Sequence, residues 1–135
     1  MNVLVDTSVW SLALRRASRS KQAYVEELAE LIREGRVVII GPIRQELLSG
    51  VRDVKQFATL REQLRAFPDL ALETEDFEQA AEFYNKCRAK GIQGSTIDFL
   101  ICAIAVRREL SIFTTDVDFT HYARVLSLQL HTSRE

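Results

Sequence analysis

Two short apolar runs on either side of an amphipathic stretch limit the fold of this chain more than any other feature of its sequence. The runs are VLV at residues 3–5 and VVII at residues 37–40, and such continuous apolar runs are typical of strands buried on both faces of a parallel sheet. The stretch between them, residues 20–35, begins at a serine, places apolar side chains near one helical face and ends at Gly35. A strand, a helix and a second strand in this order predict a β-α-β unit with parallel strands.

The remainder of the chain continues to alternate between helices and strands. We expect a buried helix over residues 95–110, which is apolar almost all round from Phe99 to Val106, and an edge strand over residues 125–131. Further helices are expected over residues 43–50, 53–65 and 75–91, and further strands over residues 70–72 and 111–116. This order predicts a three-layer α/β domain with a mostly parallel central sheet. A length of 135 residues predicts a single domain with one core over residues 1–135.

Composition excludes several classes of protein. Hydrophobic residues make up 47% of the chain and charged residues 27%, and no apolar run is long enough to cross a membrane, so we expect a soluble protein. The first ten residues lack the features of a secretory signal, which predicts a cytoplasmic location. Cys87 and Cys102 lack the spacing of a metal or disulfide site and are expected to be reduced packing residues. A formal net charge of −1 means that any nucleic acid would bind through local patches.

Four acidic residues are expected at one edge of the predicted sheet. Asp6 and Asp116 each end a predicted strand. Glu46 lies in the helix that follows the second strand, and Asp98 lies in the first turn of the buried helix. Ligands of open α/β sheets bind outside the carboxyl ends of the strands, where loops and helix starts converge. We therefore expect the four carboxylates to lie close together, with Asp118 just behind them.

Each of these acids also has a structural explanation when it is taken alone. Asp6 and Asp98 stand where a residue can cap a helix. Glu46 fits a solvated surface acid, and Asp116 with Asp118 fits a turn. Convergence changes the balance, because clustered carboxylates repel one another and need a cation. Oxygen ligands without a histidine or cysteine cluster favour Mg²⁺ or Mn²⁺, and such a site suits hydrolysis of a phosphodiester by a metal-activated water.

Hydroxyl and basic side chains are further candidates at the same edge. Three hydroxyls can hold a water molecule or a phosphate oxygen: those of Thr7, Ser8 and Thr114. Four basic residues follow the first strand, either as a solvated face or as contacts for the phosphates of a substrate: Arg15, Arg16, Arg19 and Lys21. His121 and His131 have no partner at metal-ligand spacing and are expected to be surface or packing residues.

Four segments together resemble a known family. The segments VLVDTSVW, ELLSG, IDFLICAIA and FTTDVDF, in this order, look like the motifs of the PIN-domain ribonucleases, and most closely those of the bacterial and archaeal VapC toxins. The resemblance spans nearly the whole chain. It implies a three-layer α/β/α fold and an endoribonuclease that cleaves RNA with Mg²⁺ or Mn²⁺. It also implies a homodimer and inhibition by a VapB-like antitoxin.

The resemblance assigns roles to individual residues. The acidic quartet of the family falls on four positions here: Asp6, Glu46, Asp98 and Asp116. The first, third and fourth of these are the implied metal ligands, while Thr7, Thr114 and Asp118 are implied to be accessory. Two positions depart from the family pattern. Thr115 stands where many members have Asn or Ser, and Phe99 stands where a small residue is common.

Two other classes of function remain open at this point. An aspartate at the end of the first strand also begins phosphoaspartyl phosphatases and receiver domains. Here, however, Ser8 stands where those phosphatases have a second acid, and no lysine follows Asp116. A non-catalytic module that uses its acidic cleft to bind a basic partner protein is the second alternative. The first predicts a covalent phosphoryl group on Asp6, and the second predicts tight binding without metal.

Overall fold

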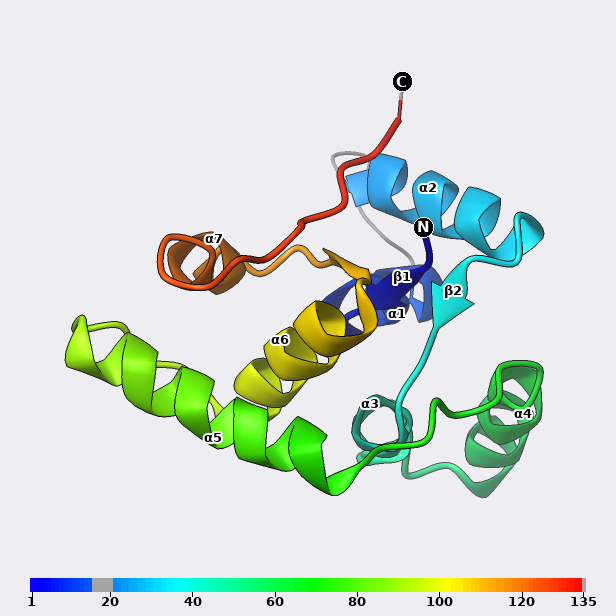
Figure 1. The fold of residues 1–135 in the computed structure, drawn as a ribbon. Helices are drawn as coiled ribbons and strands as arrows, with labels where there is room; N and C mark the ends of the chain where they lie inside the picture. The colour runs from blue at the N-terminus through cyan, green and yellow to red at the C-terminus, as the bar shows by residue number, and fades with distance from the viewer. Residues whose placement is uncertain (16–20, 135) are drawn as a thin grey trace.

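The computed structural model describes residues 1–15 and 21–134, and within them three short strands form a parallel sheet (Figure 1). Strand β1 (Val3–Val5) lies in the middle, between β2 (Val37–Val38) and β3 (Ser111–Phe113). Every side chain of β1 and β3 is buried, as expected of strands covered on both faces. The mostly parallel sheet of the sequence prediction is therefore confirmed.

The register of the sheet brings the carboxyl ends of β1 and β3 side by side. Val5, the last residue of β1, pairs with Phe113, the last residue of β3. The amide of Asp6 extends this ladder by donating to the carbonyl of Phe113 at 2.9 Å. On the other side of β1, Leu4 pairs with Val38. Asp6 and the loop after β3 therefore leave the sheet at the same edge, as predicted.

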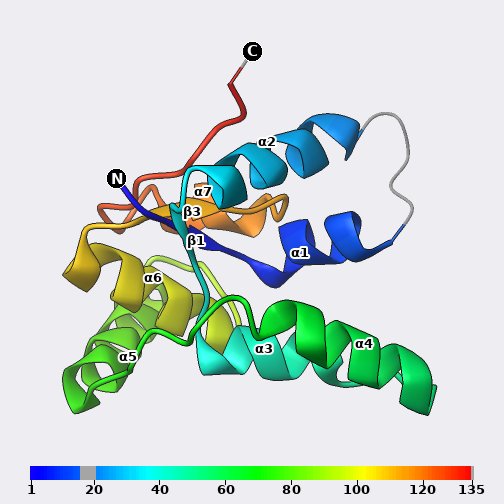
Figure 2. The same ribbon diagram turned by 90° about the vertical axis from the view of Figure 1, so that its right-hand side faces the viewer.

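Helices cover both faces of this sheet in the described part of the chain. In chain order they are α1 (Thr7–Leu14), α2 (Gln22–Arg33), α3 (Gly41–Leu48), α4 (Val54–Leu64), α5 (Thr74–Ala89), α6 (Thr96–Arg108) and α7 (Asp118–Tyr122). Helix α2 lies over one face, and α6 lies over the other with α5 alongside it and α3 and α4 beyond (Figures 1 and 2). This arrangement gives the predicted three-layer architecture. None of the described helices is long and apolar enough to cross a membrane.

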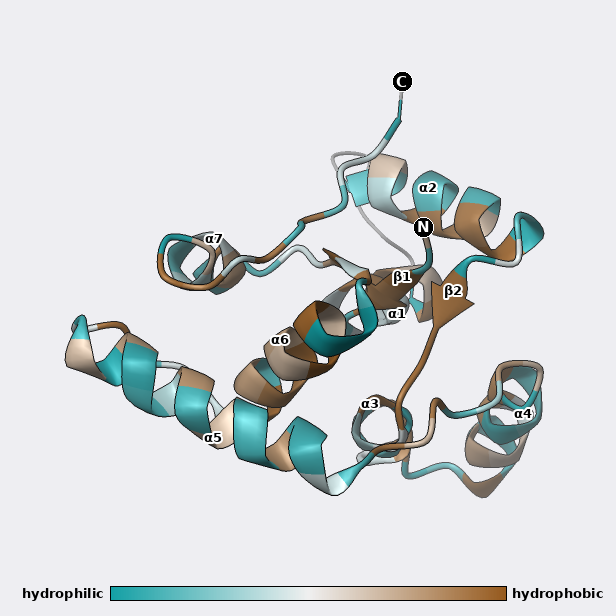
Figure 3. Cartoon of the chain, in the orientation of Figure 1, coloured by the Kyte–Doolittle hydropathy of each residue, from teal (hydrophilic) through white to brown (hydrophobic). Residues whose placement is uncertain are grey.

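Helix α6 supplies the largest share of the core. Its residues from Phe99 to Ala105 are all buried, and it is among the most hydrophobic parts of the ribbon in Figure 3. The helix begins at Ser95, whose hydroxyl accepts from the amide of Asp98 at 3.1 Å as an N-terminal cap. It ends at Glu109, which takes the left-handed conformation with φ 54°. The expected buried helix is confirmed.

A buried charge cluster joins α5 to the far end of α6. The side chain of Asp76 is completely buried, and it accepts from Nη2 of Arg108 at 2.6 Å and from Nη1 of Arg107. The amide of Glu73 also donates to Asp76, at 2.8 Å, in a capping box at the start of α5. Two guanidinium groups and one amide thus satisfy a carboxylate that has no contact with solvent.

The outer strands are shorter than the sequence predicted. Strand β2 ends at Val38, shortly before α3 begins at Gly41, and Ile39 between them makes one parallel bridge, to Asp69. Residues 70–72 form no strand. The amide of Leu70 still donates to the carbonyl of Ile39 at 2.9 Å, whereas the carbonyl of Ala71 accepts from the Arg108 side chain at 3.1 Å.

The last expected strand is also reduced to a single bridge. Residues 125–131 make one parallel bridge, between Leu130 and Ile112 of β3. The amides of Val125 and Leu126 donate back to the carbonyl of Tyr122 at 3.0 and 2.8 Å, so the first part of this segment completes the turn after α7. The predicted edge strand is therefore much shorter than expected, but the segment does lie at the edge of the sheet, beside β3.

The cysteines and one histidine lie where packing residues were expected. Cys87 and Cys102 are buried and unpaired. His131 packs edge-on against the Phe113 ring, with the ring centroids 5.1 Å apart, and its Nε2 lies 2.5 Å from an oxygen of Glu27 on α2. The segment after α7 is thereby attached to α2.

Candidate active site

Asp6 lies at the carboxyl end of β1 with one carboxylate oxygen fully engaged. Its Oδ2 accepts from the hydroxyl of Ser8 at 2.7 Å and from the hydroxyl of Thr114 at 2.8 Å. Although Asp6 stands at the first position before α1, its side chain makes no capping hydrogen bond to that helix. The explanation of Asp6 as a simple helix cap is therefore wrong. Only 9% of the residue is exposed, so both hydroxyls hold a carboxylate with little contact with bulk water.

The loop after β3 is built around the same hydroxyls. The amide of Thr115 donates to the Ser8 hydroxyl at 3.0 Å, and the amide of Asp116 donates to the Thr114 hydroxyl at 3.0 Å. Oδ1 of Asp116 then accepts from the amide of Asp118 at 2.9 Å. These bonds make the predicted turn, and the same bonds direct the loop to the side of Asp6. Asp116 is thus both a turn residue and a neighbour of the first acid.

Asp98 joins the group from the first turn of α6. Its Oδ2 accepts from the phenol hydroxyl of Tyr122 at 2.7 Å, across 24 residues of sequence. Burial raises the pKa of Asp98 above its ordinary value. Hydrogen bonds from Tyr122 and Ser95 lower it, and the charges of Asp116 and Asp6 raise it further, so that the net change is upward. The three aspartates therefore share one local electrostatic field.

Comparison with known proteins gives this arrangement a family. The PIN domain family matches residues 3–125 of the chain. Ribonuclease VapC11 of Mycobacterium tuberculosis is 35% identical over 136 residues, which cover 98% of this chain and 99% of that protein. The chain belongs to the PIN domain family. VapC ribonuclease Mb1587 of Mycobacterium bovis shows the same identity and coverage. These relatives are VapC ribonucleases, the group that the sequence motifs resemble most closely.

Solved structures support the PIN fold across the whole chain. FitAcB from Neisseria gonorrhoeae superimposes with a TM-score of 0.77 at 22% identity, covering 96% of each chain. VapBC2 from Rickettsia felis, solved bound to a DNA fragment from its promoter, also gives 0.77, at 18% identity and with 97% and 98% of the two chains covered. At these identities the likeness establishes the three-layer α/β/α fold. With the family established, the phosphoaspartyl phosphatase and receiver alternative is no longer needed.

Glu46, the fourth predicted acid of this PIN domain, shares no hydrogen bonds with the other three. Glu46 is exposed on α3, and its side chain makes no hydrogen bond or ion pair with any residue in the described ranges. In residues 1–15 and 21–134, no three acidic, histidine or cysteine side chains lie close enough together to hold a metal ion by themselves. The expected gathering of four carboxylates is therefore looser than the sequence suggested, with three acids coupled and one on an adjacent helix.

The donor chemistry of the three coupled acids nevertheless fits a hard divalent cation. In the described residues, protein hydrogen bonds engage only Oδ2 of Asp6 and only Oδ1 of Asp116, so each keeps one carboxylate oxygen free. Mg²⁺ is usually held by one or two carboxylates together with water and substrate oxygens, so three close protein ligands are not required. A cation there would also offset the repulsion that Asp6 and Asp116 exert on the charge of Asp98.

The accessory hydroxyls differ from the prediction in one respect. Thr114 contacts Asp6 as expected, but it is Ser8, and not Thr7, that contacts it from α1. Oγ1 of Thr7 is buried and has no hydrogen-bond partner among the described residues. Tyr122 was not singled out from the sequence at all, because an aromatic residue in a short helix gives no sign of which distant side chain its hydroxyl reaches.

The predicted basic patch is only partly described. Arg15 and Lys21 are exposed beside α1 and α2, while Arg16 and Arg19 lie outside the described residues.

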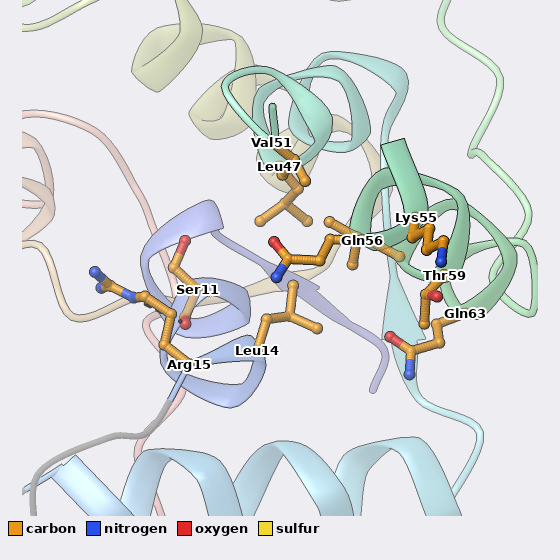
Figure 4. Close-up of a pocket in the computed structure, with 10 residues that line it drawn as sticks. Ser11, Leu14, Arg15, Leu47, Val51, Lys55, Gln56, Thr59 and Gln63 are labelled. Atoms are coloured by element: carbon orange, nitrogen blue, oxygen red, sulfur yellow. Dashed lines mark hydrogen bonds between the residues drawn. The ribbon is translucent and has the colours of Figure 1, made fainter. Parts of the chain in front are cut away.

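Arg15 also lines a separate pocket of about 610 Å³ between α1, the end of α3 and α4. In Figure 4, Leu14 and Leu47 point toward one another across this pocket, with Gln56 of α4 between them. The pocket is not lined by any of the predicted acids.

Proposed function

We propose that this chain is a VapC-type toxin, a metal-dependent endoribonuclease that hydrolyses RNA phosphodiester bonds. The observation that carries the proposal is the coupled set of Asp6, Asp98 and Asp116 in a chain that matches VapC ribonucleases over 98% of its length. RNA and a toxin made in the same cell meet in the cytoplasm, which we take as the place of action.

The three coupled acids are the groups that we assign to metal binding. When bound there, Mg²⁺ or Mn²⁺ lowers the pKa of a coordinated water and stabilises the charge that develops on the phosphate. Ser8 and Thr114 hold the Oδ2 atom of Asp6, which leaves Oδ1 toward the site. Restraint of this kind preserves a productive geometry without reorganisation during the reaction.

Glu46 is assigned to proton transfer instead of ion binding. It is exposed on α3, and no hydrogen bond or ion pair within the described residues holds its carboxylate. An unengaged carboxylate beside a phosphodiester can orient the attacking water or accept its proton. Asp118, whose amide supports Asp116, remains an accessory residue.

RNA contacts are assigned to the basic residues that follow α1. Arg15 and Lys21 are exposed, and their cations can neutralise phosphates of a bound strand. The same proposal extends to Arg16 and Arg19, which continue this basic run in the sequence. Contacts of this type position the backbone of RNA and carry little sequence information.

The partner that we propose is a VapB-like antitoxin. A solved structure from Klebsiella pneumoniae that shares this fold, with a TM-score of 0.63, is a toxin–antitoxin complex. An arginine or lysine from such a partner would form charge-assisted hydrogen bonds with the free carboxylate oxygens of Asp6 and Asp116 and compete with the metal. We also propose that the chain forms a homodimer. Light scattering at micromolar protein concentration tests this, and a monomer at that concentration would contradict it.

The central experiment compares RNA cleavage by four proteins freed of antitoxin: the wild type, Asp6→Asn, Asp98→Asn and the control Asp53→Asn. Asp53 caps α4 through a hydrogen bond from the amide of Gln56 at 3.0 Å, and asparagine caps a helix equally well. We expect both site variants to lose about 100-fold or more in rate with Mg²⁺ or Mn²⁺, because the metal contributes several kcal/mol to the transition state. The control should cleave like the wild type.

Two outcomes would remove the proposal. Equal cleavage by the wild type and both site variants would show that the aspartates are not catalytic, and cleavage that survives EDTA would show that no divalent metal is used. Tight binding of a basic partner by a wild type that neither cleaves RNA nor binds Mn²⁺ would support the non-catalytic binding module instead.

A further inference from the structure

Tyr122 is a completely buried residue whose one polar atom points at the candidate site. Its hydroxyl donates to Oδ2 of Asp98 at 2.7 Å, which links α7 to the first turn of α6. A buried phenol normally finds a hydrogen-bond partner, and a backbone carbonyl or a water would serve for that purpose. Here the partner is an ionisable carboxylate that already carries the repulsion of Asp6 and Asp116.

The aromatic packing around Tyr122 fixes the position of its hydroxyl. Its ring lies 4.9 Å from the ring of Phe99 and 5.2 Å from the ring of Phe119, measured between centroids, and both of these neighbours are also buried. Phe99 follows Asp98 in the chain, at the position where the sequence departs from the family pattern. The large side chain of Phe99 therefore helps to position Tyr122, because the two rings pack against each other.

Gly94 provides the space that the phenol occupies. A Cβ atom at this position would lie 2.2 Å from the Tyr122 oxygen and 2.7 Å from the ring carbon that carries it. The backbone of Gly94 is not in the left-handed region, so glycine is not required there by its φ angle. The close approach of the tyrosine is what excludes a side chain.

We propose that Tyr122 is a positioning residue, which holds one oxygen of Asp98 so that the other faces the metal and the RNA phosphate. This inference rests on the proposed function, because it assigns a supporting role at the same site. The hydrogen bond restricts rotation of the carboxylate, and residues that orient a metal ligand in this way commonly change metal affinity by about 10 to 100-fold when they are replaced. Gly94 and Phe99 contribute by fixing the phenol.

The test uses Tyr122→Phe, which keeps the ring and removes only the hydroxyl. The matched control is Tyr84→Phe on α5, because Tyr84 packs on the same Phe99 ring at 5.5 Å and its hydroxyl makes no hydrogen bond within the described residues. Gly94→Ala is a second variant that keeps the hydroxyl and displaces it. Thermal unfolding of all three is recorded alongside, so that a loss of fold is separated from a loss of metal.

Mn²⁺ binding to the antitoxin-free protein is measured by calorimetry without RNA, and cleavage is then measured over a range of Mn²⁺ concentrations. We expect Tyr122→Phe to bind Mn²⁺ about tenfold more weakly than the wild type. Its cleavage rate should recover toward the wild-type rate at saturating Mn²⁺, which a general packing defect would not produce. Gly94→Ala should change in the same direction, and Tyr84→Phe should match the wild type.

The possible failures are distinguishable. A Tyr122→Phe protein with wild-type Mn²⁺ affinity, while Asp98→Asn has lost binding, would overturn the positioning role and leave the proposed function intact. A wild type that binds no Mn²⁺ and cleaves no RNA would remove the proposed function and this inference with it. If Tyr122→Phe unfolds, wild-type Mn²⁺ affinity in a folded Gly94→Ala would overturn the inference.

Discussion

Replacing Asp76 by asparagine tests whether the charge cluster between α5 and α6 holds the core together. Asparagine keeps the volume of the side chain but removes its charge and one acceptor oxygen. In the wild type both oxygens are used, by Arg107 and Arg108 and by the amide of Glu73, and the side chain has no exposed surface. The variant would leave two guanidinium groups facing an amide.

The size of the expected loss follows from the burial of the partners. Removing one member of a buried ion pair commonly costs about 3 to 5 kcal/mol, because the remaining charge has no partner. The side chains of Arg107 and Arg108 keep 27% and 22% of their surface exposed and can turn toward water, so the lower end of that range applies. For a chain of 135 residues, a loss of about 3 kcal/mol lowers the unfolding temperature by about 10 °C.

Acidification gives an independent check on the same cluster. Burial raises the pKa of Asp76, but the amide of Glu73 and the two guanidinium groups outweigh burial and hold the pKa below its ordinary value of 3.8. Because the folded-state pKa is lowered, the stabilisation is complete above 3.8 and is lost as the pH falls through the lowered pKa. The difference in the free energy of unfolding between the wild type and Asp76→Asn should therefore become smaller below pH 3.8.

The assay is urea unfolding followed by circular dichroism, with Glu30→Gln as the control. Glu30 pairs with Arg33 on the exposed face of α2, where the two side chains are 47% and 73% exposed, so its replacement should change the free energy of unfolding by less than about 0.5 kcal/mol. A change below about 1 kcal/mol for Asp76→Asn would refute the reasoning, since it would mean that the buried carboxylate is no more important than a surface one.

Two further predictions concern the acids and hydroxyls of the site. Asp98→Asn should raise the urea midpoint of the metal-free protein at pH 7. Burial and the charges of Asp116 and Asp6 raise the pKa of Asp98 above 3.8, so the folded state is penalised increasingly as the pH rises above 3.8, and in full above the raised value. An equal or lower midpoint would contradict this. Ser8→Ala should weaken Mn²⁺ binding measured by calorimetry by about tenfold, because Asp6 loses a donor. Thr7→Val should leave binding unchanged, since the Thr7 hydroxyl has no described partner, and equal effects of the two variants would contradict the assignment.

The sequence was most informative about elements whose pattern is local. Apolar runs and helical periodicity predicted β1, β3 and the helices from α2 to α6, and the rule that ligands gather at the carboxyl ends of parallel strands brought Asp6 and Asp116 together. The lengths of the outer strands could not be predicted, because they depend on competing hydrogen bonds. One example is the bond from Arg108 to the carbonyl of Ala71, which joins residues 37 positions apart.

The details of the site were less predictable than its location. The choice between Thr7 and Ser8 depends on which hydroxyl of the first turn of α1 faces the loop after β3, and composition contains no information on that rotation. Tyr122 reaches Asp98 only because three aromatic rings pack in one place and Gly94 leaves room for the phenol. Contacts of this kind depend on tertiary packing, which no local pattern in one sequence reports.

Helix α6 links the stability of the domain to the geometry of the site. It is buried along most of its length and carries an acid in its first turn and arginines in its last, where the helix dipole favours both. The arginines stabilise one end by pairing with Asp76, whereas Asp98 at the other end is held among like charges. Close packing already resists sliding or rotation of this buried helix, and hydrogen bonds add a direction that apolar contacts lack. Polar bonds at both ends of α6 therefore fix the position of Asp98 more firmly than burial alone would.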